Sequence, residues 1–129
     1  EREVIRLGLN KGEDLSFIDE DEINRAIKIL SGFKKLADHY KAEFKTVATS
    51  AVREAKNREE FLLRVSRDTG IKIDVIDGSS EASLIYLGVQ KALAVIDKDV
   101  LCIDIGGGST EFILGKFHLL KVLKSVRSV

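Results

Sequence analysis

An acidic residue stands at each end of a glycine-rich run late in the chain. Asp104 and Glu111 enclose residues 105–110, which comprise an isoleucine, three glycines, a serine and a threonine. Glycine lets backbone N–H groups approach an anion closely, and the two hydroxyls add further donors. A nucleotide or polyphosphate usually arrives with Mg²⁺, which one or two carboxylates beside the phosphate oxygens can hold. The run therefore predicts a phosphate and metal site, and a hairpin whose glycines serve turn geometry alone is the alternative.

Residues 49–57 place polar side chains where a predicted strand passes into a helix. Thr49 and Arg53 lie at this junction, and such junctions are where α/β folds collect anions. Arg53 could hold a phosphate through two parallel hydrogen bonds. A surface ion pair with Glu54 is the alternative.

Glu81 occupies a second junction of the same kind. It falls in the first turn of the helix that follows residues 77–80, where the helix macrodipole favours a carboxylate. Stabilisation of the helix is one role for Glu81, and orientation of a water molecule is the other. Gly88 lies seven residues on, on the same helix face, and a mid-helix glycine costs about 1 kcal/mol relative to alanine. We therefore expect close backbone packing or room for a ligand at Gly88.

The elements that must position these groups alternate between strands and helices. Apolar or alternating runs predict the strands: residues 3–9, 44–49, 71–76, 100–103, 112–114 and 119–129. The strands at residues 100–103 and 112–114 are expected to be buried, with the glycines forming the hairpin turn between them. The order predicts an α/β fold with a mixed or mostly parallel sheet and a boundary near residues 96–99.

Capping residues predict where the helices begin and end. Asp19 with Glu22 opens a long helix, Ser50 opens a brief one, and a third runs from Asn57 to Gly70. The long helix has one apolar face, expected to be core: Ile23, Ala26, Ile27, Leu30, Phe33, Ala37 and Tyr40. The third helix is expected to turn these side chains inward: Phe61, Leu62 and Val65.

The composition is that of a globular chain with no global electrostatic field. Of 129 residues, 44% are hydrophobic and 33% charged, and the formal net charge is zero, which argues against a nucleic-acid partner. No apolar run approaches the roughly 20 residues that span a bilayer and no leader precedes a cleavage site, so we expect a cytoplasmic protein with no membrane partner. Cys102, the single cysteine, lies in a predicted strand and is expected to be a small core residue.

Three ordered segments, residues 48–57, 78–89 and 103–111, resemble the family of exopolyphosphatases and guanosine pentaphosphate phosphohydrolases. That family belongs to the superfamily of actin, Hsp70 and sugar kinases, in which two similar α/β halves enclose a phosphate-binding cleft. The resemblance implies a ribonuclease H-like, actin-like ATPase-domain fold, with a mixed sheet flanked by helices. Residues 1–96 would be part of the N-terminal subdomain, and residues 97–129 the opening strands of the second.

The resemblance also implies a role for each polar group. Glu81 would activate or orient the water that attacks the terminal phosphorus, and Asp104 and Glu111 would help hold Mg²⁺. Arg53 would contact phosphate from the other side of the cleft. The implied phosphate-binding residues are Thr49, Arg53, Gly106, Gly107, Gly108, Ser109 and Thr110. The implied reaction is hydrolysis of the terminal phosphoanhydride of inorganic polyphosphate or of guanosine pentaphosphate.

The chain departs from the family pattern in two places. Ser83 stands where family members usually carry an arginine two residues after the glutamate, and nothing before Glu3 could supply the family's first Asp-x-Gly-Ser hairpin. Family members are also much longer. We therefore expect a fragment that lacks the first phosphate-binding hairpin and that is inactive by itself.

Two other functions stay open at this point. A sensor of the same fold would bind polyphosphate or guanosine polyphosphates without hydrolysing them, and a nucleotide kinase or ATPase of the superfamily would use the same hairpin. The sequence does not choose between the two family substrates. An isolated hairpin would also expose strand edges unless it packs on the first half or pairs with another copy in a homodimer.

Overall fold

The computed structural model describes residue 7 and residues 17–93, 98–106, 109–116 and 119–127. The strand predicted at residues 3–9 lies mostly outside the described residues. The chain divides into two compact units, Glu1–Val75 and Ile76–Val129, called unit 1 and unit 2 below. Each unit is described by itself.

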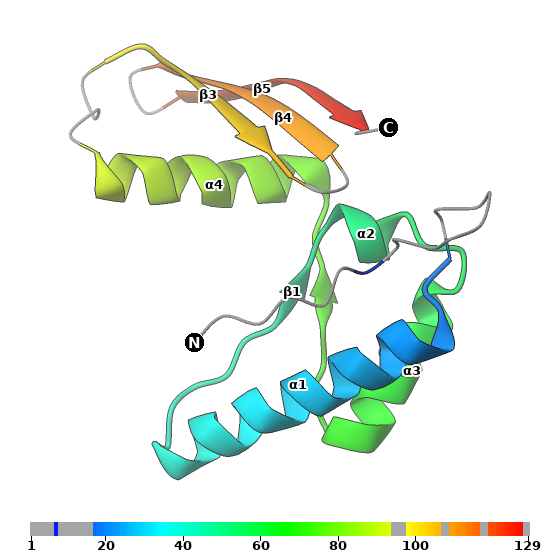
Figure 1. Ribbon diagram of the computed structural model, residues 1–129. Coiled ribbons are helices and arrows are strands. Elements are labelled where there is room, and N and C mark those ends of the chain that lie inside the picture. Colours follow the sequence, from blue (N-terminus) through cyan, green and yellow to red (C-terminus); the bar gives the residue numbers. More distant parts are fainter. Residues whose placement is uncertain (1–6, 8–16, 94–97, 107–108, 117–118, 128–129) are drawn as a thin grey trace. The chain divides into compact units, whose positions relative to one another are not determined.

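Among its described residues, unit 1 combines three helices with one pair of short strands (Figure 1). The helices are α1 (Glu20–His39), α2 (Ser50–Arg53) and α3 (Arg58–Thr69). The strands β1 (Val47–Ala48) and β2 (Asp74–Val75) pair in parallel, with Val47 opposite Asp74. Both are shorter than the strands that the sequence predicts at residues 44–49 and 71–76.

The start of α1 is fixed by a reciprocal cap. The Asp19 carboxylate accepts a hydrogen bond from the Glu22 backbone N–H at 2.7 Å, and the Glu22 carboxylate accepts from the Asp19 backbone N–H at 2.9 Å. This confirms the predicted capping pair. Its two side chains accept hydrogen bonds from backbone N–H groups at the start of the helix, where no preceding turn supplies a carbonyl partner.

The core of unit 1 forms where α1, α2 and α3 meet the connecting segments. Its buried apolar residues are Ile18, Ile23, Ala26, Val52, Ala55, Phe61, Val65 and Ile71. The predicted apolar face of α1 is correct at its N-terminal end but wrong at Tyr40, which is 72% exposed. Tyr40 is the residue at which α1 ends, so it no longer follows the helical face.

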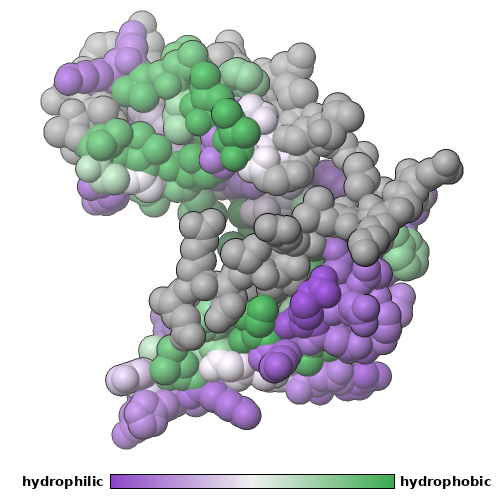
Figure 2. Space-filling model, in the orientation of Figure 1, coloured by the Kyte–Doolittle hydropathy of each residue, from purple (hydrophilic) through white to green (hydrophobic). Residues whose placement is uncertain are grey.

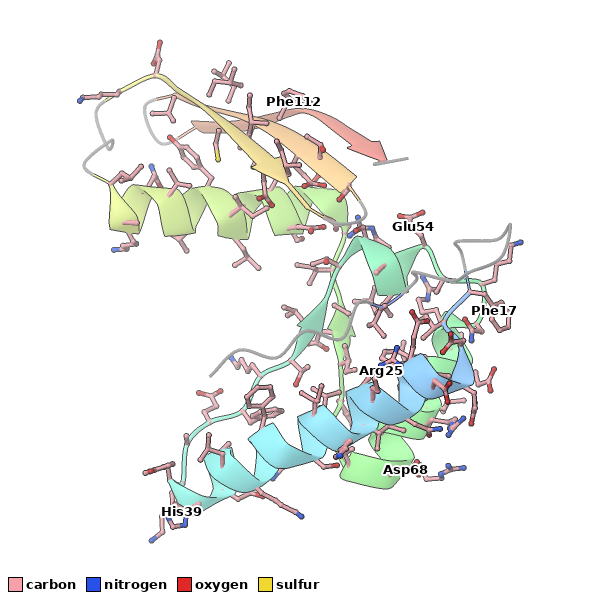
Figure 3. All side chains as sticks on the ribbon, viewed as in Figure 1. Phe17, Arg25, His39, Glu54, Asp68 and Phe112 are labelled. Atoms are coloured by element: carbon pink, nitrogen blue, oxygen red, sulfur yellow. The ribbon has the colours of Figure 1, made fainter. Side chains whose placement is uncertain are left out.

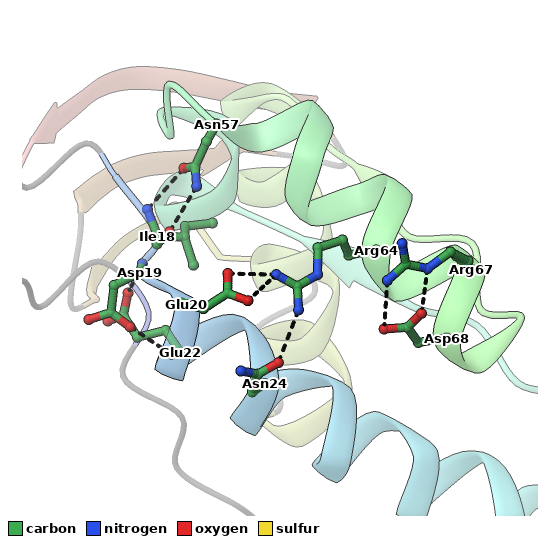
Figure 4. A network of polar contacts seen from close by, with 9 residues as sticks. All are labelled: Ile18, Asp19, Glu20, Glu22, Asn24, Asn57, Arg64, Arg67 and Asp68. Atoms are coloured by element: carbon green, nitrogen blue, oxygen red, sulfur yellow. Dashed lines mark hydrogen bonds and ion pairs between the residues drawn. The ribbon is translucent and has the colours of Figure 1, made fainter.

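Asn57 binds a distant backbone segment instead of capping α3. It stands at the N-cap position, but its side chain makes no cap hydrogen bond. Its amide donates to the Ile18 carbonyl oxygen at 2.8 Å, and its carbonyl oxygen accepts from the Ile18 N–H at 3.0 Å. Asn57 thereby ties α3 to the segment that leads into α1 (Figure 4). The expected Ser50 cap is likewise corrected, because α2 begins at Ser50 itself and Thr49 at the N-cap position makes no side-chain cap bond.

A second polar tie joins α1 and α3 through Arg64. Its guanidinium donates to a Glu20 carboxylate oxygen at 2.6 Å and to the Asn24 side-chain oxygen at 3.1 Å (Figure 4). Helix α3 then ends at Gly70, which adopts a left-handed conformation with φ of 70°. This confirms the predicted stop, since glycine reaches that region without steric cost.

Unit 2 is a three-stranded antiparallel sheet with one helix on one face (Figure 1). The helix α4 spans Gly78–Ala92, and the strands are β3 (Val100–Ile105), β4 (Ser109–Lys116) and β5 (Leu119–Arg127), in the order β3-β4-β5. The predicted hairpin and the third strand are confirmed. Asp77 caps α4 by accepting from the Ser80 N–H at 2.7 Å.

The two faces of this sheet differ in burial. On the helix-facing side, Ala82, Tyr86 and Ile113 form a buried cluster, with Val100 and Cys102 packed against it. On the other side, Leu101, Ile103 and Ile105 are 56%, 51% and 78% exposed. The prediction of fully buried strands is therefore wrong for this outer face. Apolar residues are also gathered on the face of unit 2 that Figure 2 shows.

Both kinds of pairing expected for a mixed sheet are present among the described strands, but in separate sheets. The strands β1 and β2 pair in parallel, and β3, β4 and β5 pair antiparallel. The two compact units divide between Val75 and Ile76, and α4 packs on the hairpin strands within unit 2. The predicted boundary near residues 96–99 stays a prediction. The assignment of residues 1–96 and 97–129 to two subdomains stays a prediction. None of the described helices is both long enough and apolar enough to cross a membrane.

Candidate functional site

The helix-facing side of the hairpin changes from apolar to acidic along its length. Successive opposed pairs on this face are Val100 with Gly115, Cys102 with Ile113, and Asp104 with Glu111. Directly opposed residues of an antiparallel pair point to the same side of the sheet. Asp104 and Glu111 therefore stand side by side at the end of the hairpin nearest its turn.

Glu111 lies in an unusual environment for a carboxylate. It is 1% exposed, and Ser109 on the same face is 6% exposed, whereas Asp104 is half-buried. Burying a charge is costly unless other groups or an ion compensate it. A pair of oxygen donors in this setting is suited to a hard cation such as Mg²⁺, which is commonly held by one or two carboxylates together with phosphate oxygens.

The turn between β3 and β4 is tight. The Gly106 N–H donates to the Ser109 carbonyl oxygen at 2.9 Å, and a Cβ atom added at Gly106 would lie 3.2 Å from that oxygen. Thr110 stands opposite Ile105. The predicted phosphate-binding residues Gly107 and Gly108 lie outside the described residues. The described part of the turn brings Gly106 and Ser109 together, as the sequence predicts.

Helix α4 brings Glu81 to the same end of unit 2. Tyr86 packs on Gly115, and Ala82 shares a cluster with Ile113, so α4 runs in the same direction as β4. Its first turn, which carries the half-buried Glu81, consequently lies at the end of the sheet that holds the hairpin turn (Figure 1). The N–H groups and macrodipole of that turn favour negative charge there.

Cys102 precedes Asp104 by two residues on the helix-facing side of β3. Burial, and secondarily the Asp104 carboxylate, raise the pKa of its thiol above the ordinary value. A raised pKa keeps the thiol protonated at neutral pH, which is the unreactive form. This agrees with the expected role as a small packing residue.

Thr49 and Arg53 belong to unit 1, at the two ends of α2. The Arg53 Nε lies 3.3 Å from a carboxylate oxygen of Glu54, so the ion pair that the sequence offered as an alternative is present. Glu54, labelled in Figure 3, is half-exposed, and exposed ion pairs contribute only about 0–1 kcal/mol. The pair is therefore weak enough to open for an anion, and phosphate binding by Thr49 and Arg53 stays a prediction.

The structure differs from the prediction at Gly88, and it contains one contact, between Tyr86 and Gly115, that was not predicted. A Cβ atom at Gly88 would meet no atom within 4 Å, so the close backbone packing predicted there is wrong, and room for a ligand stays a prediction. The contact between Tyr86 and Gly115 has no signal in local sequence. Within the described part of the chain, no three His, Cys, Asp or Glu side chains form a metal-binding group.

The sequence matches the Ppx/GppA phosphatase family over residues 1–128. It is 40% identical over 122 residues to the bifunctional 3-dehydroquinate synthase/phosphatase of Fusobacterium nucleatum, covering 90% of this chain and 18% of that protein. It is 37% identical over 121 residues to the guanosine-5'-triphosphate,3'-diphosphate pyrophosphatase of Photobacterium profundum, covering 93% and 24%. The chain thus spans about a fifth to a quarter of these relatives.

A solved structure agrees with this likeness. The exopolyphosphatase of Cytophaga hutchinsonii superposes with a TM-score of 0.79 at 36% identity, covering 95% of this chain and 39% of that one. The predicted actin-like α/β fold is thereby confirmed, together with the predicted family. The acidic hairpin, the helix that carries Glu81 and the match over almost the whole sequence agree, and the chain belongs to the Ppx/GppA phosphatase family.

Proposed function

We propose that the whole protein that carries this chain is a Mg²⁺-dependent phosphohydrolase. Its substrate would be inorganic polyphosphate or guanosine pentaphosphate, and the bond cleaved would be the terminal phosphoanhydride. The pyrophosphatase and exopolyphosphatase relatives support the reaction class. The observation that carries the proposal is the opposed Asp104–Glu111 pair beside a glycine turn, at the end of the sheet where α4 begins.

The residues of unit 2 divide the work of phosphoryl transfer. Such reactions need positioning and charge neutralisation more than covalent chemistry. The backbone N–H groups of the turn, with the hydroxyls of Ser109 and Thr110, would hold phosphate oxygens. Asp104 and Glu111 would hold the metal ion, which when bound neutralises charge on the phosphate. Glu81 would orient the water for attack on the terminal phosphorus.

The burial of Glu111 supports this division. A carboxylate that is 1% exposed cannot be explained as a solvated surface group. Glu111 occupies a core position at which an apolar side chain would stabilise the sheet. We infer that the charge is kept there because the reaction needs it.

The test is phosphate release by the whole protein with Mg²⁺, measured separately on long-chain polyphosphate and on guanosine pentaphosphate. The unmodified protein is compared with Glu81→Gln, which keeps the size of the side chain and removes its charge. We expect release to fall by about 10²–10⁴-fold, which is the usual contribution of a general acid or base. The preferred substrate identifies the activity.

Glu60→Gln is the matched control, because Glu60 also lies in the first turn of a helix, α3, and is exposed. It should leave release unchanged. Binding of polyphosphate without release by the unmodified protein would overturn the hydrolase and leave a sensor. Full release by Glu81→Gln would remove Glu81 from the mechanism.

A further inference from the structure

The ring of Tyr86 lies directly on the backbone of Gly115. A Cβ atom added at Gly115 would stand 1.9 Å from Cζ of Tyr86, 2.0 Å from its hydroxyl oxygen and 2.3 Å from Cε2. Such distances are far below any non-bonded contact, so no other residue at position 115 is compatible with this place for the ring. Tyr86 is 5% exposed and belongs to the buried cluster of unit 2.

This contact joins the two elements, α4 and β4, that carry the proposed catalytic groups Glu81 and Glu111. On α4, Tyr86 and Ala82 face the sheet, and Glu81 directly precedes Ala82. On β4, Gly115, Ile113 and Glu111 alternate along the same face. The separation of α4 from β4 at Tyr86 and Gly115 therefore continues along both elements to Glu81 and Glu111.

We propose that Tyr86 and Gly115 are positioning residues that set the distance between Glu81 and Glu111. The inference rests on the proposed function. Neither residue touches the reacting atoms. Gly115 has no side chain, so the ring of Tyr86 packs directly on its backbone. The rigid ring then holds α4 at a set distance from β4.

Close packing makes this spacer sensitive to one added carbon. Protein interiors have little free volume, so an extra methyl group forces side-chain or backbone shifts. Tyr86 is stiff and enclosed, and either the ring leaves the cluster or α4 moves away from β4. A misplacement of about 1 Å in a catalytic group can cost on the order of 10²-fold in rate.

Gly115→Ala is the first variant, tested in the whole protein. We expect kcat for phosphate release to fall by roughly 10- to 100-fold with little change in KM, because the glycine turn that holds phosphate is untouched. Each assay is run well below the thermal midpoint of the variant. A purely structural role would lower the midpoint without this separation of kcat from KM.

A compensating pair provides the sharper test. The clashing atoms are all at the far end of the tyrosine ring, and leucine lacks every one of them. Adding Tyr86→Leu to Gly115→Ala should therefore restore most of kcat. Adding Tyr86→Phe is the matched control, because phenylalanine keeps Cζ and Cε2, and it should restore nothing.

The outcomes separate this inference from the proposed function. Phosphate release by the unmodified protein together with unchanged kcat in Gly115→Ala would overturn the positioning role alone. Equal rescue by leucine and phenylalanine would also overturn it, because the clash would then not be the cause. No release by the unmodified protein would overturn the proposed function and the positioning role together, and the thermal midpoints of the same variants would still report the packing.

Discussion

Among the described residues, eight buried apolar side chains form the core of unit 1, whereas three form that of unit 2. Unit 1 also buries a glutamate, Glu22, but that carboxylate caps α1. In unit 2, Glu111 and Ser109 occupy positions on the helix-facing side of the sheet where apolar residues would otherwise pack. Among the described residues, polar side chains therefore take a larger share of the buried positions in unit 2 than in unit 1.

The two units also differ in how distant segments are joined. Unit 1 uses specific polar ties, from Asn57 to Ile18 and from Arg64 to Glu20. Unit 2 joins its helix to its sheet through apolar packing and the contact between Tyr86 and Gly115. Substitutions should therefore destabilise unit 1 and unit 2 through the loss of different interactions.

The largest expected effect is on the core of unit 1. Phe61→Ala removes a side chain that is 2% exposed and should lower the free energy of unfolding of unit 1 by about 3–5 kcal/mol. Hydrogen exchange resolved by residue would locate the loss in unit 1. Leu63→Ala, on the same helix but 70% exposed, is the control and should change stability by no more than about 0.5 kcal/mol. Similar losses in both variants would contradict the assignment of Phe61 to a core.

The two buried glutamates, Glu22 in unit 1 and Glu111 in unit 2, should respond differently to substitution. Glu111→Gln should lower phosphate release by about 10²–10³-fold, close to 3–4 kcal/mol in the barrier, because a charge that serves the transition state is lost. Glu22→Ala should lower stability by about 1 kcal/mol, through loss of the cap, and leave release unchanged below the thermal midpoint. Steady-state release and thermal unfolding of both variants measure this. Reduced phosphate release in Glu22→Ala, or unchanged phosphate release in Glu111→Gln, would contradict this difference between the two units.

The Asn57 tie should have an intermediate effect. Asn57→Ala leaves the N–H and carbonyl groups of Ile18 without their side-chain partner, and Ile18 is 1% exposed. We expect a loss of about 1–3 kcal/mol, the cost of unsatisfied buried polar groups, measured by chemical denaturation. Asn24→Ala removes an exposed acceptor of Arg64 and should cost less than about 0.5 kcal/mol. A negligible effect of Asn57→Ala would mean that water replaces the tie.

The smallest effect concerns Asp68, whose pKa is lowered by its hydrogen bond to Arg67 and secondarily by the charge of that guanidinium. A lowered pKa stabilises the folded state above about pH 3.8, the ordinary value, and this contribution disappears as the pH falls through the lowered pKa. Asp68→Asn should remove that part of the acid dependence by lowering the thermal midpoint slightly at neutral pH and leaving it unchanged at pH 2. Midpoints measured between pH 2 and pH 7 test this. A large drop at pH 7 would show that the pair is more than a surface contact.

Local signals in the sequence predicted the elements well where their cause is local. The capping box of Asp19 and Glu22, the Gly70 stop and the hairpin all depend on residues within a few positions of one another. The same holds for the acidic pair at the hairpin, because strand alternation places Asp104 and Glu111 once the turn is known. Family, fold and candidate site could therefore be inferred from residue types and spacing.

Contacts between distant segments could not be inferred in this way. Nothing near Asn57 indicates that its partner is Ile18, and local spacing alone predicted a cap instead. The outer face of β3 is apolar, as a buried strand would be, yet Leu101, Ile103 and Ile105 are exposed, because burial depends on what packs against a face. Phe112, opposite Ile103, lies on the same outer side (Figure 3).

Residue types and their spacing are enough to identify the chemical groups of this protein and the turns and helix starts in which they lie, because capping, alternation and glycine turns act over a few residues. The burial of Glu111, the shared direction of α4 and β4 and the contact of Tyr86 with Gly115 follow only from the three-dimensional packing. Those facts depend on the close packing of segments separated along the chain, where the shape of one side chain sets the place of another.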